Sequence, residues 1–168
     1  MEKMNNGLRK NILSLLERNA RLSAGEIAVY LDAPETDVAD EIAKLEADQI
    51  VCGYGAFINW DRMEDEYLEA FIEVKVTPSR GQGFNRIAER ISQFDEVKAV
   101  HLMSGSYDLA VMIAGKSIKD ISLFVSDKLS PLESVLSTAT HFVLRKYKDH
   151  GVIFNERPDD GERLIVSP

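Results

Sequence analysis

The segment SGSYD, residues 104–108, gathers groups that could bind a small molecule. Gly105 has no side chain, so it can adopt positive φ and let a ligand approach the backbone. The carboxylate of Asp108 could hold an ammonium group through a charge-assisted hydrogen bond, and Ser104 and Tyr107 stand beside it. The same residues also suit an ordinary hairpin turn, in which Asp bonds its own backbone and Tyr packs on the sheet. The residues alone leave both interpretations open.

A second group of candidate residues lies on one predicted helix, residues 35–48. Val38, Ile42 and Leu45 recur at helical spacing and would form its buried side. The helical projection places five charged residues on one flank of the solvent side, next to a strip of Thr36, Ala39 and Ala43: Asp37, Asp40, Glu41, Lys44 and Asp48. With Glu35 and Glu46 the helix has six carboxylates against one lysine. Its spacing indicates the second helix of a helix-turn-helix, whereas its charge is typical of a solvated face.

Carboxylates on a helix that enters a DNA groove have opposing consequences. Most non-specific affinity for DNA comes from Lys and Arg that neutralise phosphates, so extra acids weaken binding and add repulsion. Asp and Glu can nevertheless accept a hydrogen bond from cytosine N4 in the major groove. Five cations on and around the first helix could contact phosphates: Lys3, Arg9, Lys10, Arg18 and Arg21. The candidate DNA-binding residues are therefore Arg9, Lys10, Ser23, Thr36, Asp37, Ala39, Asp40 and Lys44.

Three predicted helices and a hairpin would position this surface within residues 1–60. Four apolar residues at helical spacing predict the first helix: Leu8, Ile12, Leu15 and Leu16. Ser23 and Glu26 form a capping box that starts a short second helix, which ends at Leu31. After the turn DAP comes the acidic helix, and IVCGYGAFIN, residues 50–59, alternates loosely around two glycines and predicts a small hairpin. This order predicts a winged helix-turn-helix.

A second domain is predicted over residues 67–155, after the acidic linker DRMEDE at 61–66. The segment LEAFIEVKV alternates as a half-buried strand, with Leu68, Ile72 and Val76 on its apolar face. Helix FNRIAERISQF, strands VKAVHLMS and LAVMIA, helix SIKDISLFVSDKLSPLE and the long strand SVLSTATHFVLRKY follow. The order βαββαβ is that of a ferredoxin-like fold, so the fold class is α+β. Residues 156–168 are expected to form a tail.

Composition limits the classes of protein further. The net charge is −8, and residues 1–60 alone hold 6 Lys and Arg against 10 Asp and Glu, so the N-terminal half lacks the basic character typical of a nucleic-acid-binding domain. Cys52 is the single cysteine, which excludes an intramolecular disulfide and a cysteine-based zinc site. No apolar run could span a bilayer, and no secretory signal precedes the first helix. We expect a cytoplasmic protein with no cofactor, metal or membrane partner.

Three segments in order give the chain a family resemblance: LEADQIVCGYGAFIN at 45–59, SGSYDLAVMI at 104–113 and STATHFVLRKYK at 137–148. Together with the predicted domains, they resemble the Lrp/AsnC (feast/famine) family of transcriptional regulators. The resemblance implies DNA binding by the N-terminal domain, and dimers and higher homo-oligomers through the C-terminal sheet. It also implies a small effector, usually an amino acid, near the Gly-x-Tyr-Asp turn. Carried over to this sequence, the effector-binding residues are Ser104, Gly105, Tyr107, Asp108, Thr138 and Thr140.

Two departures from the family keep alternatives open. In the family, the residue at the position of Asp40, and usually the one at the position of Glu41, tends to be neutral or basic. The residue at the position of Pro34 is usually a Ser that caps the helix. An oligomer could offset weak single contacts with DNA through avidity; alternatively, a ligand-sensing oligomer would bind DNA weakly or not at all and act through a protein partner.

A related two-domain layout occurs in sirohaem decarboxylases, which use histidines. His101, His141 and His150 show no catalytic order or metal-ligand spacing here, so no enzyme is predicted.

Overall fold

The computed structural model describes residues 2–63, 66–78 and 83–154, with side chains from Gly7 onward. The chain divides into two compact units, Met1–Ile58 and Asn59–Pro168, which are described separately below. The predicted tail 156–168 and the side chain of Lys3 lie outside the described residues. Within the described ranges, no helix is long and apolar enough to cross a membrane.

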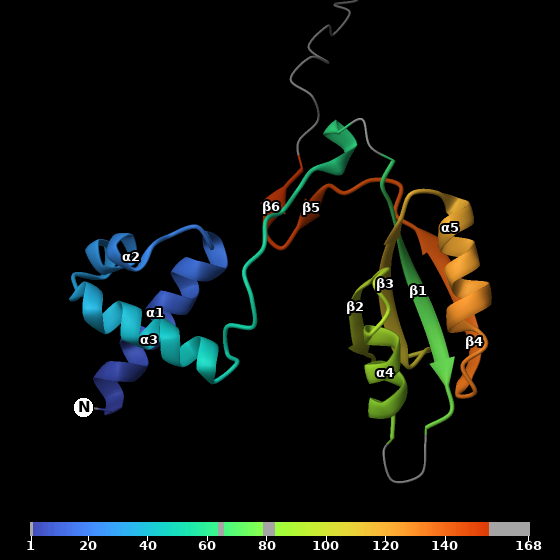
Figure 1. Ribbon diagram of the computed structural model, residues 1–168, viewed down its shortest axis with the longest axis horizontal. Helices are drawn as coiled ribbons and strands as arrows, with labels where there is room; N and C mark the ends of the chain where they lie inside the picture. The colour runs from blue at the N-terminus through green and yellow to red at the C-terminus, as the bar shows by residue number, and fades with distance from the viewer. Residues whose placement is uncertain (1, 64–65, 79–82, 155–168) are drawn as a thin grey trace, which may run out of the picture. The chain divides into compact units, whose positions relative to one another are not determined.

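The first unit is built from three helices, α1 (Glu2–Arg18), α2 (Ala24–Leu31) and α3 (Glu35–Ala47) (Figure 1). Each helix turns an apolar stripe inward, because its apolar residues recur every three or four positions. The fully buried side chains of this core are Ile12, Ile27, Val38 and Leu45. Leu16, Ala28 and the half-buried Ile42 complete the core. The three predicted helices are therefore present.

A three-residue turn joins α2 to α3. The predicted capping box of Ser23 and Glu26 forms, since Ser23 Oγ accepts from the Glu26 N–H at 3.2 Å and Glu26 Oε2 accepts from the Ser23 N–H at 2.8 Å. Asp32 ends α2 in the left-handed region, with φ of 49°. Pro34 precedes α3 and makes no side-chain cap, as expected for proline. The sequence thus encodes a helix, a sharp turn and a second helix.

The predicted wing is wrong. Residues 51–59, all of which the structure describes, form no strand. The N–H groups of Ile50 and Val51 both bond to Leu45 O, at 2.9 and 3.0 Å, so the start of the expected hairpin closes the end of α3 instead. Residues 52–58 are exposed. With no apolar face covered by a partner, nothing selects a strand pairing, and residues 52–58 do not join a sheet.

The second unit contains a four-stranded antiparallel sheet in the order β2-β3-β1-β4 (Figure 1). The strands are β1 (Leu68–Val76), β2 (Val97–Leu102), β3 (Leu109–Gly115) and β4 (Val135–Phe142). Helix α4 (Asn85–Ser92) joins β1 to β2, and α5 (Ile118–Leu123), prolonged by η2 (Phe124–Leu129), joins β3 to β4. The predicted βαββαβ order and ferredoxin-like topology are confirmed for this unit.

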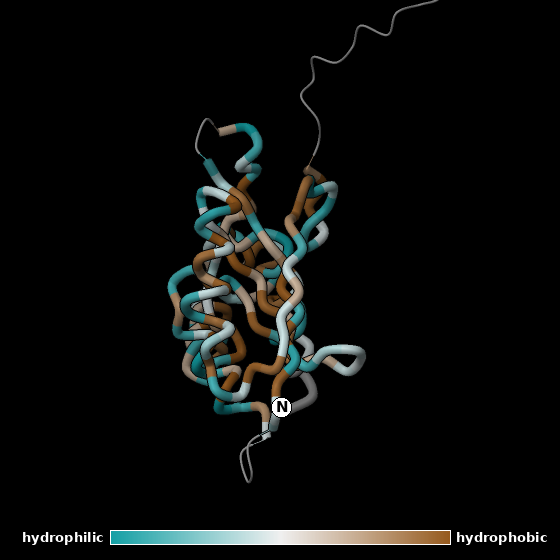
Figure 2. The backbone as a smooth tube through the Cα atoms, turned by 90° about the vertical axis from the view of Figure 1, so that its right-hand side faces the viewer, coloured by the Kyte–Doolittle hydropathy of each residue, from teal (hydrophilic) through white to brown (hydrophobic). Residues whose placement is uncertain are grey.

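Both helices of this unit cover the same face of the sheet (Figure 1). Their apolar sides meet the inward residues of the central strands, and Ile72, Ile91, Leu109, Ile113 and Ile121 are almost fully buried. Figure 2 shows hydrophobic and hydrophilic residues alternating around the helices, as this one-sided burial requires.

The other sheet face has no helix packed on it within the described part of the chain. The registers of β1, β3, β2 and β4 place one set of side chains there, called the open face below: Phe71, Glu73, Ala99, His101, Ala110, Met112, Ala139 and His141. An apolar centre of Phe71, Ala110 and Met112 is thus flanked by two histidines and a glutamate. Such a surface is typical of an interface.

The last strand is shorter than predicted. β4 ends at Phe142, and the chain continues into a small hairpin of β5 (Lys148–Asp149) and β6 (Val152–Ile153). The hairpin turns through His150 and Gly151, whose φ values are 45° and 82°. Just before this hairpin, Lys146 Nζ lies 2.6 Å from Glu69 Oε2 and 3.5 Å from Asp149 Oδ2. Sequence alternation alone did not reveal this ion cluster.

Candidate DNA-binding face and effector site

The exposed side of α3 carries most of the predicted DNA-binding residues. Thr36, Asp37, Ala39, Asp40 and Lys44 are all exposed. Val38 and Leu45 hold the opposite side against the core. The N-terminal half of α3 therefore presents small and acidic side chains to solvent, and one cation, Lys44, follows in its last turn. This arrangement offers one hydroxyl, two carboxylates and one ammonium group for contacts to DNA.

Glu41 does not belong to this exposed flank, which corrects the sequence prediction. Its side chain is 4% exposed and its Oε1 lies 2.9 Å from Arg9 Nε of α1. Arg9 Nη2 also donates to Asp48 Oδ2 at 3.0 Å. The guanidinium thus joins α1 to two carboxylates of α3. Because a buried carboxylate requires a partner, Arg9 serves the fold, and its charge is largely neutralised before any phosphate approaches.

The remaining predicted DNA-binding residues have different positions. Ser23 uses its hydroxyl to cap α2, so it positions the turn before α3. Lys10 is exposed on α1. With Glu41 and Asp48 paired to Arg9, the charges left on the predicted flank are Asp37, Asp40 and Lys44. Two further carboxylates of α3, Glu35 and Glu46, are also exposed, so the solvent side of the helix stays acidic.

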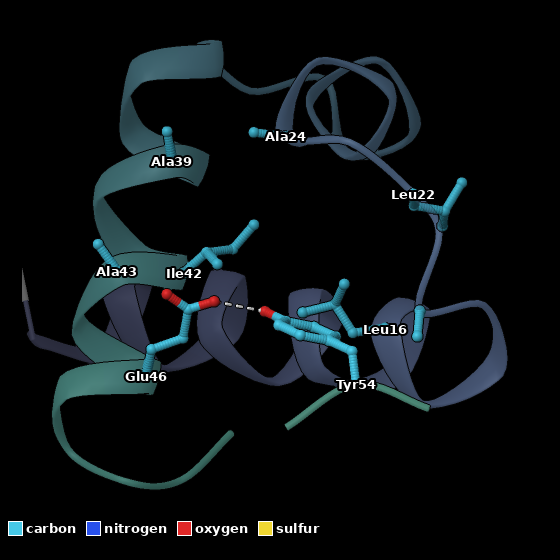
Figure 3. A pocket seen from close by; sticks show the side chains of 9 residues that line it. Leu16, Leu22, Ala24, Ala39, Ile42, Ala43, Glu46 and Tyr54 are labelled. Carbon is cyan, nitrogen blue, oxygen red and sulfur yellow. Dashed lines mark hydrogen bonds between the residues drawn. The ribbon is translucent and has the colours of Figure 1, made fainter. Parts of the chain in front are cut away.

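A small apolar pocket lies beside this surface, and the predicted DNA-binding residue Ala39 is among its lining residues (Figure 3). Its volume is about 310 Å³, and α1, the α1–α2 segment, α2 and α3 all contribute to its walls. Tyr54 closes one side by donating a hydrogen bond from its hydroxyl to Glu46 Oε1 at 2.7 Å. This bond to a carboxylate raises the pKa of Tyr54. Sequence reasoning missed the Tyr54–Glu46 pair because it assigned Tyr54 to a hairpin.

In the second unit, Asp108 is bound to the backbone of β1. Its Oδ2 accepts from the Val76 N–H at 2.9 Å, and its own N–H donates to Val74 O at 3.1 Å. Tyr107 places its ring edge-on to Phe71 of the open face, with centroids 5.9 Å apart. Tyr107 thus packs on the sheet as the turn interpretation expects, whereas the Asp108 carboxylate bonds the backbone of β1 and not that of its own turn.

The conformation expected of Gly105 is wrong. Among the described residues, the glycines with positive φ are Gly83 and Gly151. Gly105 lies in an exposed bend, and a Cβ built there would meet nothing within 4 Å. Its backbone, like that of Ser104, is accessible from solvent. The open space around this bend is compatible with a ligand, although no left-handed turn creates it.

The structure separates the two predicted threonines from the Gly-Ser-Tyr-Asp bend by one strand. Thr138 and Thr140 face Val74 and Ile72 across the β4–β1 register. They therefore lie on the helix-covered side of the sheet, whereas Tyr107 packs on the open face. Thr138 lies level with Asp108, since Asp108 bonds Val74 from the other side of β1. Thr140 lies farther along the strand.

The histidines show no catalytic arrangement. His141 Nε2 lies 3.4 Å from Glu73 Oε1 on the open face. His150 Nδ1 lies 2.7 Å from Asp149 Oδ1 in the β5–β6 hairpin. No group of three or more metal-ligating side chains occurs among the residues that the structure describes.

Comparison with known proteins gives both units a context. A family model described as the Lrp/AsnC ligand-binding domain matches residues 69–153. The chain is 49% identical over 158 residues to an uncharacterised HTH-type transcriptional regulator, YugG of Bacillus subtilis, covering 94% of this chain and 95% of that protein.

Two solved structures share the fold. The transcriptional regulator NMB0573 of Neisseria meningitidis, in a complex with L-Met, is 23% identical, with a TM-score of 0.68 over 84% of this chain and 91% of that chain. AsnC of E. coli is 19% identical, with a TM-score of 0.63 over 83% of this chain and 92% of that chain. At these identities the likeness establishes the fold.

Proposed function

Because the chain belongs to the Lrp/AsnC family of transcriptional regulators, which are not enzymes, we propose that it binds DNA through α3 and a small effector through its second unit. The observation that carries the DNA proposal is the exposed N-terminal half of α3, which is held by a capped α2 and by the Arg9–Glu41 ion pair. A recognition helix needs such rigid support. In this proposal, residues 1–60 bind DNA and residues 67–155 bind the effector and partner subunits.

The chemistry of α3 favours contacts to bases over contacts to phosphates. Thr36 can donate to or accept from a base edge, and Asp40 can accept from cytosine N4. Lys44 and Lys10, both exposed, supply the phosphate contacts. Since this surface offers few cations, each single unit binds DNA weakly, and an oligomer gains affinity by presenting several units at once.

The open face supports a homodimer. Its centre of Phe71, Ala110 and Met112 is apolar and lies on a sheet that is covered by helices on one side only. Packing this face against a second copy would bury the partly exposed Phe71 and Met112, because Ala110 is already buried, and would give the two-layered β-sandwich that half-covered sheets tend to form. Dimers then assemble into a higher homo-oligomer.

The effector is proposed to be an amino acid that contacts the bend at residues 104–108. Support comes from the accessible backbone at Ser104 and Gly105 and from the L-Met complex of NMB0573. Asp108 would hold the ammonium group, and Thr138 is the nearer of the two threonines. The effector stabilises one oligomer over another by its differential affinity for the two, which changes the spacing of the DNA-binding units.

Fluorescence anisotropy tests the DNA proposal with duplexes from the region upstream of the protein's own coding sequence. Thr36→Ala and Lys44→Ala should each weaken binding, by about 1–3 kcal/mol where a base contact is lost. Lys119→Ala removes an exposed cation of α5 and is the matched control, which should bind like the unaltered chain. If Lys44→Ala and Thr36→Ala leave affinity unchanged, α3 is not the DNA-binding helix.

A second function is favoured by one observation, the two exposed carboxylates Asp37 and Asp40 beside the single Lys44. In this alternative the oligomer senses a ligand and acts through a protein partner that complements the acidic surface. The same anisotropy experiment separates the two functions, because an absence of binding to every duplex at low salt leaves only the partner hypothesis.

A further inference from the structure

A small polar pocket in the second unit is not used by the proposed function. It lies between α4 and the turn that precedes β4, and its volume is about 120 Å³. This is well below the ~300–1,000 Å³ of pockets for drug-sized ligands. None of its lining residues belongs to the bend at 104–108. The pocket is lined by Arg86, Ile87, Arg90, Leu132, Glu133 and Ser134.

The charged side chains of this pocket are Arg86, Arg90 and Glu133. Arg86 and Arg90 are four residues apart on α4, so their side chains project from the same helix face. Within the described residues, no ion pair joins either arginine to a carboxylate, and none joins Glu133 to a cation. Two guanidinium groups and one carboxylate thus line the same cavity without meeting, which leaves room between them for a ligand that carries both charges.

The floor of the pocket is fixed by the core and by the backbone. Ile87 and Leu132 are 6% and 7% exposed. The turn closes with a bond from the Val135 N–H to Leu132 O at 2.8 Å, and the Thr77 N–H donates to Ser134 O at 2.8 Å, which ties the turn to the end of β1. In the described part of the chain, no hydrogen bond of the Ser134 hydroxyl to protein is present. A rigid apolar floor therefore lies beneath unpaired polar groups.

We propose that this pocket binds a small neutral α-amino acid as its zwitterion. Arg86 and Arg90 bind the carboxylate, for which the planar guanidinium is well suited. Glu133 binds the ammonium group, and a short side chain lies against Ile87 and Leu132. A phosphate or a simple carboxylate would meet the same arginines but would be repelled by Glu133. This pocket would be a second site, distinct from the proposed effector site at residues 104–108. We expect the two sites to bind ligand independently.

Isothermal titration calorimetry of the full-length protein with L-alanine tests the site. The double variant Arg86→Gln/Arg90→Gln should weaken L-alanine binding by about tenfold to hundredfold, the loss expected for hydrogen bonds to charged groups. Lys98→Gln removes an exposed cation of β2 and should change nothing. Circular dichroism checks that both variants fold, which is expected because both arginines are exposed.

A second variant tests whether the pocket recognises the ammonium group as well as the carboxylate. Glu133→Gln should weaken binding of L-alanine about tenfold and leave binding of propionate, which has no ammonium group, unchanged or stronger. If inorganic phosphate or propionate binds the unaltered protein as tightly as L-alanine, the pocket is an oxyanion site and the proposal is wrong. Unchanged L-alanine binding in the arginine variant also overturns it.

Different results would reject the pocket as a binding site and reject the proposed effector site at residues 104–108. L-alanine binding that persists in the arginine variant but is lost in Asp108→Asn would place the ligand at the bend and reject the new site. L-alanine binding lost only in the arginine variant supports the new site, whatever the bend binds. An absence of L-alanine binding in the unaltered protein overturns the new site, and DNA binding then still tests the proposed function.

Discussion

Arg9 Nε of α1 lies 2.9 Å from Glu41 Oε1 of α3, and Glu41 is buried between the two helices. One of the carboxylates expected to repel DNA is therefore buried within the fold. Its partner Arg9 is more exposed, but its guanidinium is already paired with Glu41 and Asp48. The pair fixes the orientation of α3, and this orientation decides which side chains face solvent.

Removal of one member of this pair should destabilise the first unit. Arg9→Met leaves Glu41 buried without a partner, and the free energy of unfolding should fall by about 3 kcal/mol, at the low end for a broken buried pair because Arg9 is 32% exposed. Urea denaturation followed by circular dichroism measures the loss.

Two further variants make this measurement specific. The double variant Arg9→Met/Glu41→Leu should recover most of the lost stability, because apolar residues can replace a buried pair. Lys10→Met, an exposed neighbour on α1, should have a small effect. An Arg9→Met protein as stable as the unaltered chain would show that the pair is not important for folding.

How far the sequence predicted the first unit depends on the residue. Helical spacing located α1, α2 and α3, and Ser23 with Glu26 located the cap, because these signals are local. Helical projection placed Glu41 on the solvent side, since the partner that draws it inward is Arg9, 32 positions earlier. The hairpin at 50–59 was wrong because glycines and loose alternation do not distinguish a strand from an extended segment without knowledge of what covers it.

Asp108 should contribute to the stability of the second unit. Asp108→Ala leaves the Val76 N–H without its acceptor, so the free energy of unfolding should fall by about 1–3 kcal/mol. Asp108→Asn keeps an acceptor oxygen and should lose less. Asp95→Ala, an exposed aspartate elsewhere in the unit, is the control for thermal denaturation. Equal melting temperatures for Asp108→Ala and the control would remove the turn role and leave ligand binding as the function of this carboxylate.

The second unit was easier to predict than its site. Period-two alternation in LEAFIEVKV is preserved in β1, whose Ala70, Ile72 and Val74 are fully buried, and the order of elements gave the topology. The bend at 104–108 was predicted in position but not in backbone conformation, because Gly105 does not require positive φ. Thr138 and Thr140 were grouped with the bend by family resemblance, while the register puts β1 between them.

Tyr67 should give the protein a sensitivity to alkaline pH. Burial and a hydrogen bond to Glu69 Oε1 at 2.7 Å raise the pKa of Tyr67 far above its ordinary value. A raised folded-state pKa gives stability that is fully present below the unfolded pKa of about 10 and is lost as pH rises toward the folded pKa. Tyr67→Phe should lose stability less steeply above about pH 10. Identical profiles in urea denaturation from pH 8 upward would contradict this.

The open face should carry the proposed dimer. Ala139→Lys places a charge at an exposed position opposite Glu73 in the register, so the single chain can accommodate it, whereas a dimer interface would bury it. We expect size-exclusion chromatography with light scattering to show mainly monomers. Val29→Lys, at a position of α2 that is 82% exposed, is the control and should keep the oligomer. An unchanged oligomer in Ala139→Lys would place the interface elsewhere.

The salt dependence of DNA binding distinguishes base recognition by α3 from general attraction to phosphates. Anisotropy of a labelled upstream duplex with the full-length protein, from low to physiological salt, gives the slope of log K against log salt. Since each phosphate contact adds about −0.9 to this slope, and since α3 and α1 offer few unpaired cations, the account predicts a shallow slope and clear preference for the upstream sequence over a scrambled one. A steep slope without sequence preference, or no binding at low salt, would contradict it.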